Sequence, residues 1–348
     1  MPPSCATRSS ACARRQTKSN MTTQKELLPG VFLSAVQDRR FKTACFSLSF
    51  LRPLCEGEAA MNALLPSVLL RGSKKTPSIR AIAGRLDELH GASAGALVRK
   101  KGEIQLTGLF ADCLEDQYAG EAVFSRLLDF VSELLFCPQT ENGAFLPELV
   151  RQERENLRNA MHGVLDDKGA YCERQLLRTM CRGERYACGR LGEPEALDKI
   201  DAHTLWAHDK SVLASSRIEL FYLGSKSAEE AEAQGLLPAH DGVEPVLFAS
   251  AEHRVQKQHH GILRALQRHV RRFSQTELET ARTGLLSDLR LLCDSPGRLD
   301  EFYTGRAAAG VSQTPAGLAA ALRAVTAEDI CAAARGVRPD TVYTLEEA

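Results

Sequence analysis

The side chains in this sequence best suited to hold a metal ion are its eleven cysteines and nine histidines. Cys172, Cys181 and Cys188 lie between His162 and His203 in one stretch, but their spacings match no zinc pattern. No C-x-x-C occurs in the chain, so paired metal-binding or redox motifs are absent. We therefore interpret the cysteines as reduced thiols, many of them small core residues, and expect no metal site.

Carboxylates, hydroxyls and glycines are also numerous, but we interpret none of them as a catalytic or cofactor-binding set. Serine, histidine and aspartate all occur without an arrangement that we assign to a hydrolase triad. The glycines form neither G-x-G-x-x-G nor a phosphate-binding loop. Glu153 and Glu155 share a charged stretch with Arg151, Arg154 and Arg158. That pattern predicts ion pairs along a solvated helix face.

Hydrophobic patterns define the elements that would position such side chains. In Phe46–Phe50 large apolar residues alternate with serines, which predicts a strand with one buried face. Glu56–Leu65 is rich in helix formers and predicts a helix that stops near Gly72. Other predicted helices cover residues 79–89, 124–135, 147–164, 168–181, 194–200, 203–213, 262–273, 276–293, 315–324 and 327–334, and other predicted strands cover 104–110, 218–223, 246–248 and 341–345. Strands and helices do not alternate strictly, so the predicted fold class is α+β.

Length and charge set the broad class. A chain of 348 residues suggests about two domains. Basic and acidic residues are balanced at 44 each, which argues against a protein that binds polyanions over its whole surface. No stretch approaches the ~20 apolar residues of a membrane span, so we expect a cytoplasmic protein with no membrane partner. We interpret residues 1–27 as a disordered N-terminal extension; a transit peptide and a true start at Met21 are the two readings of its basic first part.

Several segments, taken in order, resemble the insulinase-like (pitrilysin-type) zinc metallopeptidases. The run from Ala63 to Ser73 corresponds to the family's H-x-x-E-H helix, and its last three residues, Arg71-Gly72-Ser73, anchor the match. Later matching segments are Leu86–Ala92, Phe145–Met161, Asp294–Gly297, Thr314-Pro315 and Val325–Ile330. The chain looks most like the degenerate branch of this family that is associated with aminopentanol modification of elongation factor P. The resemblance covers roughly residues 28–345.

The resemblance implies where zinc chemistry would lie, and this chain departs from the family there. The two zinc-binding histidines fall on Ala63 and Ser67, the general base on Pro66, and the third ligand on Ala160. A methyl group offers no lone pair, a neutral hydroxyl is a poor zinc ligand, and proline has no carboxylate. We therefore expect no catalytic residue, no metal ligand and no cofactor. We also expect Pro66 to bend the helix or to mark its start.

The family resemblance further implies two peptidase-like halves, each a mostly antiparallel sheet flanked by helices. We place the first half at residues 28–212 and the second at 213–348, opening with the strand near Ile218. The second half is shortened by an internal deletion near residues 253–261. The neighbouring basic run contains Arg254, Lys257, Arg264, Arg268, Arg271 and Arg272 and no acid. We interpret it as one face of a surface helix, and we read His259-His260 as no metal site, because adjacent helix residues point in different directions.

The leading functional hypothesis is a noncatalytic insulinase-family protein. It would bind a peptide or protein together with an active, zinc-containing relative, as a heterodimer. Two alternatives stay open. One is a zinc metalloendopeptidase with an unconventional site. The other is a regulatory protein associated with RNA or the ribosome through Arg264, Arg268, Arg271 and Arg272, although we do not expect a nucleic-acid partner.

Overall fold

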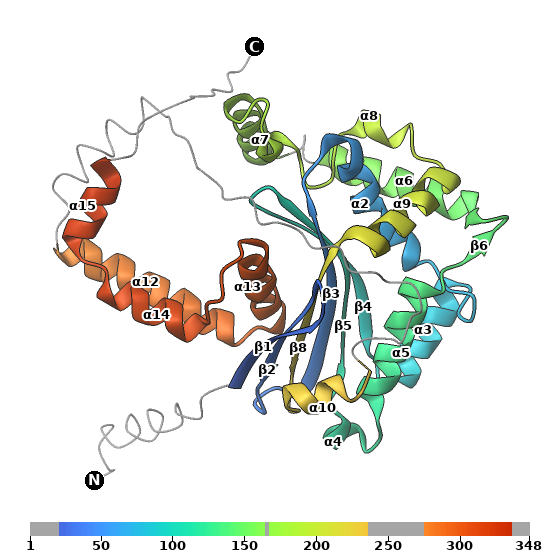
Figure 1. Ribbon diagram of the computed structural model, residues 1–348, viewed down its shortest axis with the longest axis horizontal. Coiled ribbons are helices and arrows are strands. Elements are labelled where there is room, and N and C mark those ends of the chain that lie inside the picture. The colour runs from blue at the N-terminus through green and yellow to red at the C-terminus, as the bar shows by residue number, and fades with distance from the viewer. Residues whose placement is uncertain (1–20, 164–166, 236–274, 336–348) are drawn as a thin grey trace, which may run out of the picture.

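The computed structural model describes residues 21–163, 167–235 and 275–335, and a six-stranded sheet is its centre (Figure 1). The strand order is β1-β2-β8-β3-β5-β4. Neighbouring strands are antiparallel except β2 and β8, which are parallel. The strands are β1 (Met21–Leu28), β2 (Val31–Gln37), β3 (Thr43–Pro53), β4 (Ser93–Lys101), β5 (Ile104–Leu114) and β8 (Arg217–Gly224), and β6 (Thr140–Glu141) pairs with β7 (Ala144–Phe145) elsewhere. The predicted α+β class with a mostly antiparallel sheet is confirmed.

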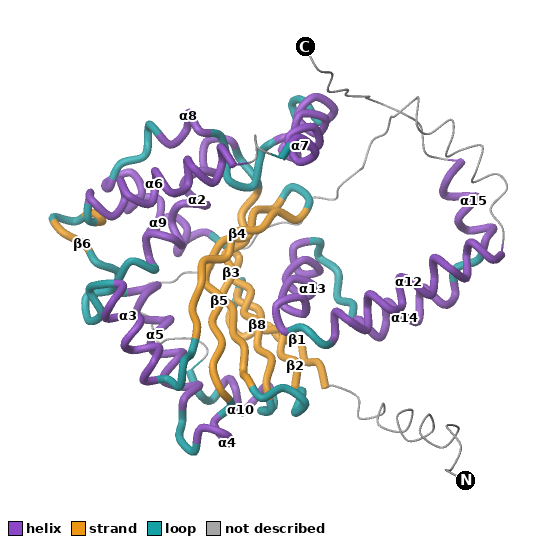
Figure 2. The backbone as a smooth tube through the Cα atoms, turned by 180° about the vertical axis from the view of Figure 1, so that it is seen from behind, coloured by secondary structure: helices purple, strands orange, loops and turns teal. Residues whose placement is uncertain are grey.

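A layer of helices covers one face of this sheet, on the right in Figure 1 and on the left in the view from behind (Figure 2). Leu64 and Val68, from a helix early in the chain, form one buried core with Phe124 of a later helix. Leu48 and Leu220 of the sheet belong to the same core. The helices of this layer and its rim are α2 (Glu56–Leu69), α3 (Ile79–Glu88), α4 (Asp116–Ala119), α5 (Val123–Phe136), α6 (Pro147–His162), α7 (Lys168–Met180), the short 3-10 turn η3 (Arg185–Ala187), α8 (Pro194–Leu197), α9 (Ala202–Ser215) and α10 (Ala228–Glu232). Most lie within a few residues of their predicted positions.

Helix α2 runs through Pro66 rather than starting there. Pro66 lies in its last turn, and the backbone N–H of Leu70 still donates to the Pro66 carbonyl at 3.1 Å. Proline lacks an N–H donor and crowds the turn before it, but its carbonyl stays available, so the turn that follows it can close. Of the two expectations for Pro66, the one that the helix begins there is therefore wrong, and the expected bend stays a prediction.

The opposite face of the sheet is covered by α13 (Pro296–Ala308). Leu299 and Tyr303 of α13 pack against Phe221 and Leu223 of β8. This second layer buries Ser47 as well, whose hydroxyl donates to Asp300 at 2.5 Å. The expectation that β3 has a single buried face is therefore wrong, because a helix from the far end of the chain covers its serine side.

Two strands differ from the expected division of the chain. Residues 21–27, assigned above to a disordered extension, form most of β1, which pairs with β2. β1 is an edge strand, and its sequence is accordingly polar. A polar sequence gives no hydrophobic pattern from which a strand could be predicted. Likewise β8, expected to open the second half, lies between β2 and β3 in the sheet of the first. The division into two peptidase-like halves itself stays a prediction.

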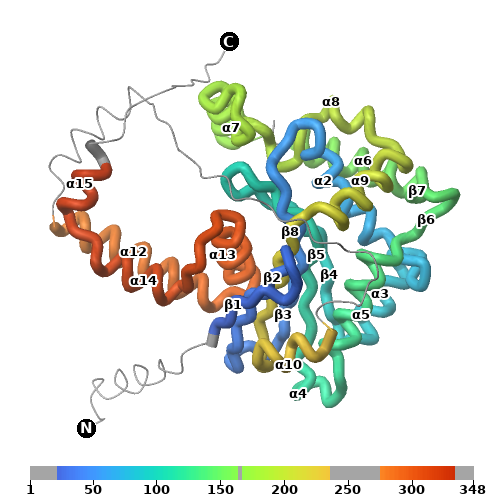
Figure 3. Tube along the Cα trace, viewed as in Figure 1, coloured from blue at the N-terminus to red at the C-terminus, as the bar shows by residue number. Residues whose placement is uncertain are grey.

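The remaining described helices lie beyond α13, on the side away from α2 (Figure 3). They are α12 (Gln275–Cys293), α14 (Pro315–Ala324) and α15 (Ala327–Arg335). The predicted elements at 246–248, 262–273 and 341–345, the internal deletion and the basic run all fall outside the described residues, as do residues 1–20. Among the helices of the described ranges, none is both long and apolar enough to cross a membrane.

Candidate functional site

The positions that correspond to the family's zinc site lie on α2 and α6. Ala63 is only 3% exposed, Pro66 is buried and Ser67 is half-buried, whereas Ala160 is exposed near the end of α6. These side chains supply one hydroxyl and no carboxylate or imidazole. Across the described ranges, no three or more His, Cys, Asp or Glu side chains are grouped so as to hold a metal ion. Our expectation that the chain has no metal ligand stays a prediction.

Helices α2 and α6 are nevertheless joined by a part-buried ion pair. Just beyond α2, Arg71 donates from its guanidinium to Oε1 of Glu153 in α6, and Asn156 donates to the same oxygen at 3.2 Å. Glu153 is 6% exposed. The interpretation of Glu153 as part of a solvated face is therefore wrong, because Glu153 is buried and pairs with Arg71, which lies far from it in the sequence. Glu155 is exposed and pairs with Arg158 at 3.5 Å, as predicted.

The glycine and serine that follow Arg71 have structural roles. Gly72 has a φ of +152°, and a Cβ there would lie 2.9 Å from the Thr76 carbonyl oxygen. The buried Ser73 hydroxyl donates to Glu133 and accepts from the Thr76 N–H at 2.8 Å. Only glycine fits this turn comfortably. The run that anchors the family resemblance therefore shapes the end of α2 without needing a metal.

A buried polar network lies beside Ala63 and was not anticipated from the sequence. Gln105 of β5 donates through Nε2 to the carbonyls of Ala59 at 3.0 Å and Arg190 at 2.7 Å, so its Oε1 is an acceptor. Asn62 donates to that oxygen at 2.9 Å, and its own Oδ1 lies 2.7 Å from Nε2 of His208 in α9. The only signal for it in the sequence is an asparagine inside the apolar run of α2.

This network fixes the state of His208. Because Asn62 Oδ1 can only accept, Nε2 of His208 must donate. Burial lowers the pKa of His208 to about 4, against the opposing charge of Glu58 and with some help from Arg52, so the ring is neutral at neutral pH. A neutral imidazole with a proton on Nε2 has an acceptor lone pair on Nδ1. His208 therefore presents a hydrogen-bond acceptor from that nitrogen.

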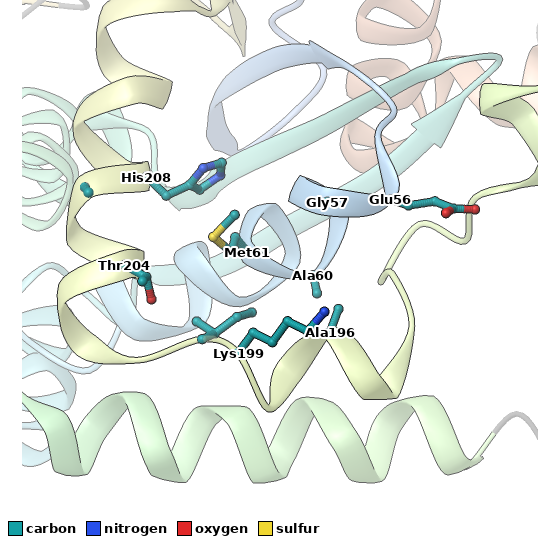
Figure 4. A pocket seen from close by; sticks show the side chains of 10 residues that line it. Glu56, Gly57, Ala60, Met61, Ala196, Lys199, Thr204 and His208 are labelled. Carbon is teal, nitrogen blue, oxygen red and sulfur yellow. The ribbon is translucent and has the colours of Figure 1, made fainter.

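His208 also lines a pocket between α2, α8 and α9 (Figure 4). The pocket has a volume of about 630 Å³. Ala60 and Met61 line it from α2, and Lys199 and Ile200 from the segment before α9. Met61 lies between His208 and Lys199, and the carboxylate of Glu56, which also lines the pocket, points away from Lys199 (Figure 4). The pocket thus combines apolar walls with one cation, Lys199, one carboxylate directed away from it, and the polar side chains of Thr204 and His208.

Asp209, next along α9, is a buried acid whose Oδ2 has no hydrogen-bond partner among the described residues. Burial raises its pKa to about 7, against the opposing charge of Lys210.

The three cysteines between His162 and His203 are free thiols: Cys181 and Cys188 are buried and Cys172 is half-buried. Burial raises the pKa of Cys188 to about 11, so its thiol is protonated and a poor nucleophile at neutral pH.

One motif was overlooked in the sequence. Residues 91–95, Gly-Ala-Ser-Ala-Gly, have the form G-x-S-x-G. A hydrolase elbow joins a strand to a following helix, whereas here α3 precedes Ser93, which begins β4. The Ser93 hydroxyl donates to Asp112 rather than to a histidine. The motif is therefore part of a helix-to-strand turn and not a nucleophile.

Strand β4 lies at one edge of the sheet and pairs with β5. The Val98 carbonyl accepts a hydrogen bond from Nη1 of Arg190 at 3.2 Å, so it faces away from β5. The backbone N–H and C=O groups of successive residues in a strand point to alternate sides. The N–H and C=O groups of Ala94 and Ala96 therefore point to the same open side as those of Val98. α2 packs against this strand. An extended chain could therefore pair with β4 close to α2.

Comparisons with known proteins bear on this arrangement. No family model matches the sequence. A protein of Bacillus subtilis (strain 168) named "Probable inactive metalloprotease YmfF" is 30% identical over 206 residues, which are 59% of this chain and 48% of that protein. The chain thus spans about half the length of this curated relative.

Solved structures share the fold. The crystal structure of a conserved protein from Enterococcus faecalis V583 superposes with a TM-score of 0.74 at 20% identity, over 91% of this chain and 96% of that one. A "putative M16-like peptidase" from Alicyclobacillus acidocaldarius gives 0.66 at 12% identity, over 92% and 96%. M16 is the insulinase-like family. The chain therefore has the fold of M16-like peptidases and a relative named as inactive, which is consistent with a degenerate member of the insulinase-like family.

Proposed function

We propose that this chain is a noncatalytic peptidase-like protein that binds a peptide or protein segment along β4 and works together with an active, zinc-containing relative. The observation that carries the proposal is that the scaffold around the zinc position persists without its ligands. Arg71 and Glu153 still join α2 to α6, while Ala63, Pro66 and Ser67 offer neither imidazole nor carboxylate. A zinc hydrolase needs a metal-bound water and a base, and these positions supply neither a metal ligand set nor a base.

Binding without cleavage is supported by the open edge of β4. An exposed strand edge can accept an extended chain through main-chain hydrogen bonds, and side-chain pockets then select the sequence. The cations at the end of β4 already have partners within the chain: Arg99 pairs with Asp300 and Lys101 with Glu301, and Lys100 donates to backbone carbonyls. The strand edge therefore offers main-chain groups rather than free charge to a bound segment. The name of the Bacillus subtilis relative, "Probable inactive metalloprotease YmfF", agrees with a role in binding.

The active relative would supply the zinc chemistry that this chain lacks. In the family that this chain resembles, an inactive member often pairs with an active one that carries H-x-x-E-H. A role connected with elongation factor P modification and a cytoplasmic location follow from the same resemblance and remain proposals.

Co-purification from the native host tests the partnership. The tagged chain should retain a relative that carries H-x-x-E-H, and mass spectrometry would identify it. Ala96→Pro removes a backbone N–H on the open side of β4 and should weaken capture of an extended peptide library, whereas Ala96→Val, which keeps that N–H, should not. Equal peptide capture by both variants and no H-x-x-E-H relative in the eluate would refute the proposal.

A further inference from the structure

The pocket between α2, α8 and α9 is a second candidate site, separate from the edge of β4. Its walls on α2 are small or flexible, because Gly57, Ala60 and Met61 face it. A Cβ added at Gly57 would meet only the Cys55 sulfur, at 3.9 Å, so the space beside this turn is open. A pocket of about 630 Å³ is within the size range of small-molecule sites.

Of the four polar residues that line the pocket, Lys199 and His208 differ in kind. Lys199 is exposed and supplies a mobile positive charge, and the carboxylate of Glu56 is directed away from it (Figure 4). His208 is held rigidly through Asn62 and Gln105, and its Nδ1 can only accept a hydrogen bond. Met61 lies between these two groups (Figure 4). A matching ligand needs an anion at one end, an apolar middle and a hydrogen-bond donor at the other end.

We propose that this pocket binds a small apolar carboxylate that carries a hydroxyl or amide N–H at the end away from its charge. The carboxylate pairs with Lys199, the apolar body lies against Ala60, Met61 and Ile200, and the donor reaches His208 Nδ1. Two sources share this chemistry: a free hydroxy acid and the C-terminus of an apolar peptide. The site needs neither the β4 edge nor a zinc-containing relative, so it can stand if the proposed function fails.

Calorimetric titration of the full chain tests the proposal. The probes are ω-hydroxyoctanoate, octanoate, and N-acetyl-Leu-Leu as the free acid and as the amide. We expect saturable binding of ω-hydroxyoctanoate, and about tenfold weaker binding of octanoate, which lacks the donor. The free acid of the dipeptide should bind more tightly than its amide if peptide termini are the natural source, and ω-hydroxyoctanoate should outcompete it if free acids are.

Three variants locate the binding. Ala207→Leu places a larger side chain on the pocket wall contributed by α9 and should abolish binding. Ala214→Leu, on an exposed position of the same helix outside the pocket, is the matched control and should bind normally. Lys199→Ala should weaken the binding of the carboxylates and leave the binding of the dipeptide amide unchanged. Binding that survives Ala207→Leu, no saturable binding by any probe, or equal affinity for octanoate and its hydroxylated form would overturn the proposal.

Discussion

Arg71, just past the end of α2, forms an ion pair with Glu153 of α6 in which the carboxylate is buried and the guanidinium half-buried. In the family that this chain resembles, the same two helices supply the zinc ligands. Here an arginine and a glutamate from neighbouring positions join the helices directly. This contact between the two helices therefore does not depend on a metal ion.

Removal of either partner of this pair should be costly. Arg71→Ala leaves the carboxylate of Glu153 buried with only Asn156 as a partner, and should lower the free energy of unfolding by about 3 kcal/mol. Urea unfolding of Arg71→Ala, Glu153→Ala and the double variant would measure it. The double variant should lose clearly less than the sum of the two single changes. Strict additivity would show that the two side chains do not interact.

A second buried pair should govern how α13 docks on the sheet. Arg99 of β4 donates to Oδ2 of Asp300 at 2.5 Å, and Asp300 is fully buried. Burial raises the pKa of Asp300, while Arg99 opposes that rise. Arg99→Ala should therefore destabilise the protein by about 3–5 kcal/mol and speed proteolysis within α13. Lys101→Ala, which removes an exposed pair with Glu301, is the control and should change the cleavage rate little.

Asp209 should make the protein less stable as the pH rises. Its pKa is about 7 in the folded chain against 3.8 in the unfolded chain, so the folded state holds the proton more tightly. The associated stability is present below about pH 4 and is lost as the pH rises through 7. Asp209→Asn should therefore stabilise the protein by about 2–4 kcal/mol near pH 8 and have little effect near pH 4. Urea unfolding at both pH values checks this, and an equal effect at both would contradict it.

His208 should act in the opposite direction. Its pKa is about 4 in the folded chain against 6.5 in the unfolded chain, so the unfolded state binds the proton more tightly. The stability that this shift contributes is present above 6.5 and is lost as the pH falls towards 4. His208→Gln should flatten the stability profile across that window. Nitrogen NMR of the wild-type ring should show the Nε2–H tautomer at neutral pH, and the Nδ1–H form would refute the network as drawn.

Much of the fold follows from local patterns in the sequence. The amphipathic stripe of Phe124, Leu127, Leu128 and Val131 marks α5 because all four side chains are buried in one core. Strand β4 was missed as an element, and only the start of helix α13, at Asp294–Gly297, was indicated, by the family resemblance. β4 begins with small residues, Ser93-Ala94-Gly95-Ala96, which carry little strand pattern.

The polar features of the site could not be derived locally, because each depends on partners far along the chain. Glu153 is surrounded in sequence by arginines, yet its partner is Arg71, 82 positions away. Asn62 and His208 are separated by 146 positions, and Ser47 and Asp300 by 253. A pattern of neighbouring residues predicts which face of an element is apolar, but not which distant side chain satisfies a buried charge. The expectation that Ala63 and Ser67 replace the two zinc-binding histidines, and Pro66 the general base, rests on the family resemblance alone and stays a prediction.

The metal content of the purified chain tests the central claim most directly. The protein should be isolated from its own host without added metal, and its zinc content should be measured by elemental mass spectrometry. The same preparation should be assayed for peptide cleavage with and without a chelator. We predict zinc far below one ion per chain and no cleavage that the chelator abolishes. One tightly held zinc ion per chain, together with cleavage that the chelator stops, would contradict the account.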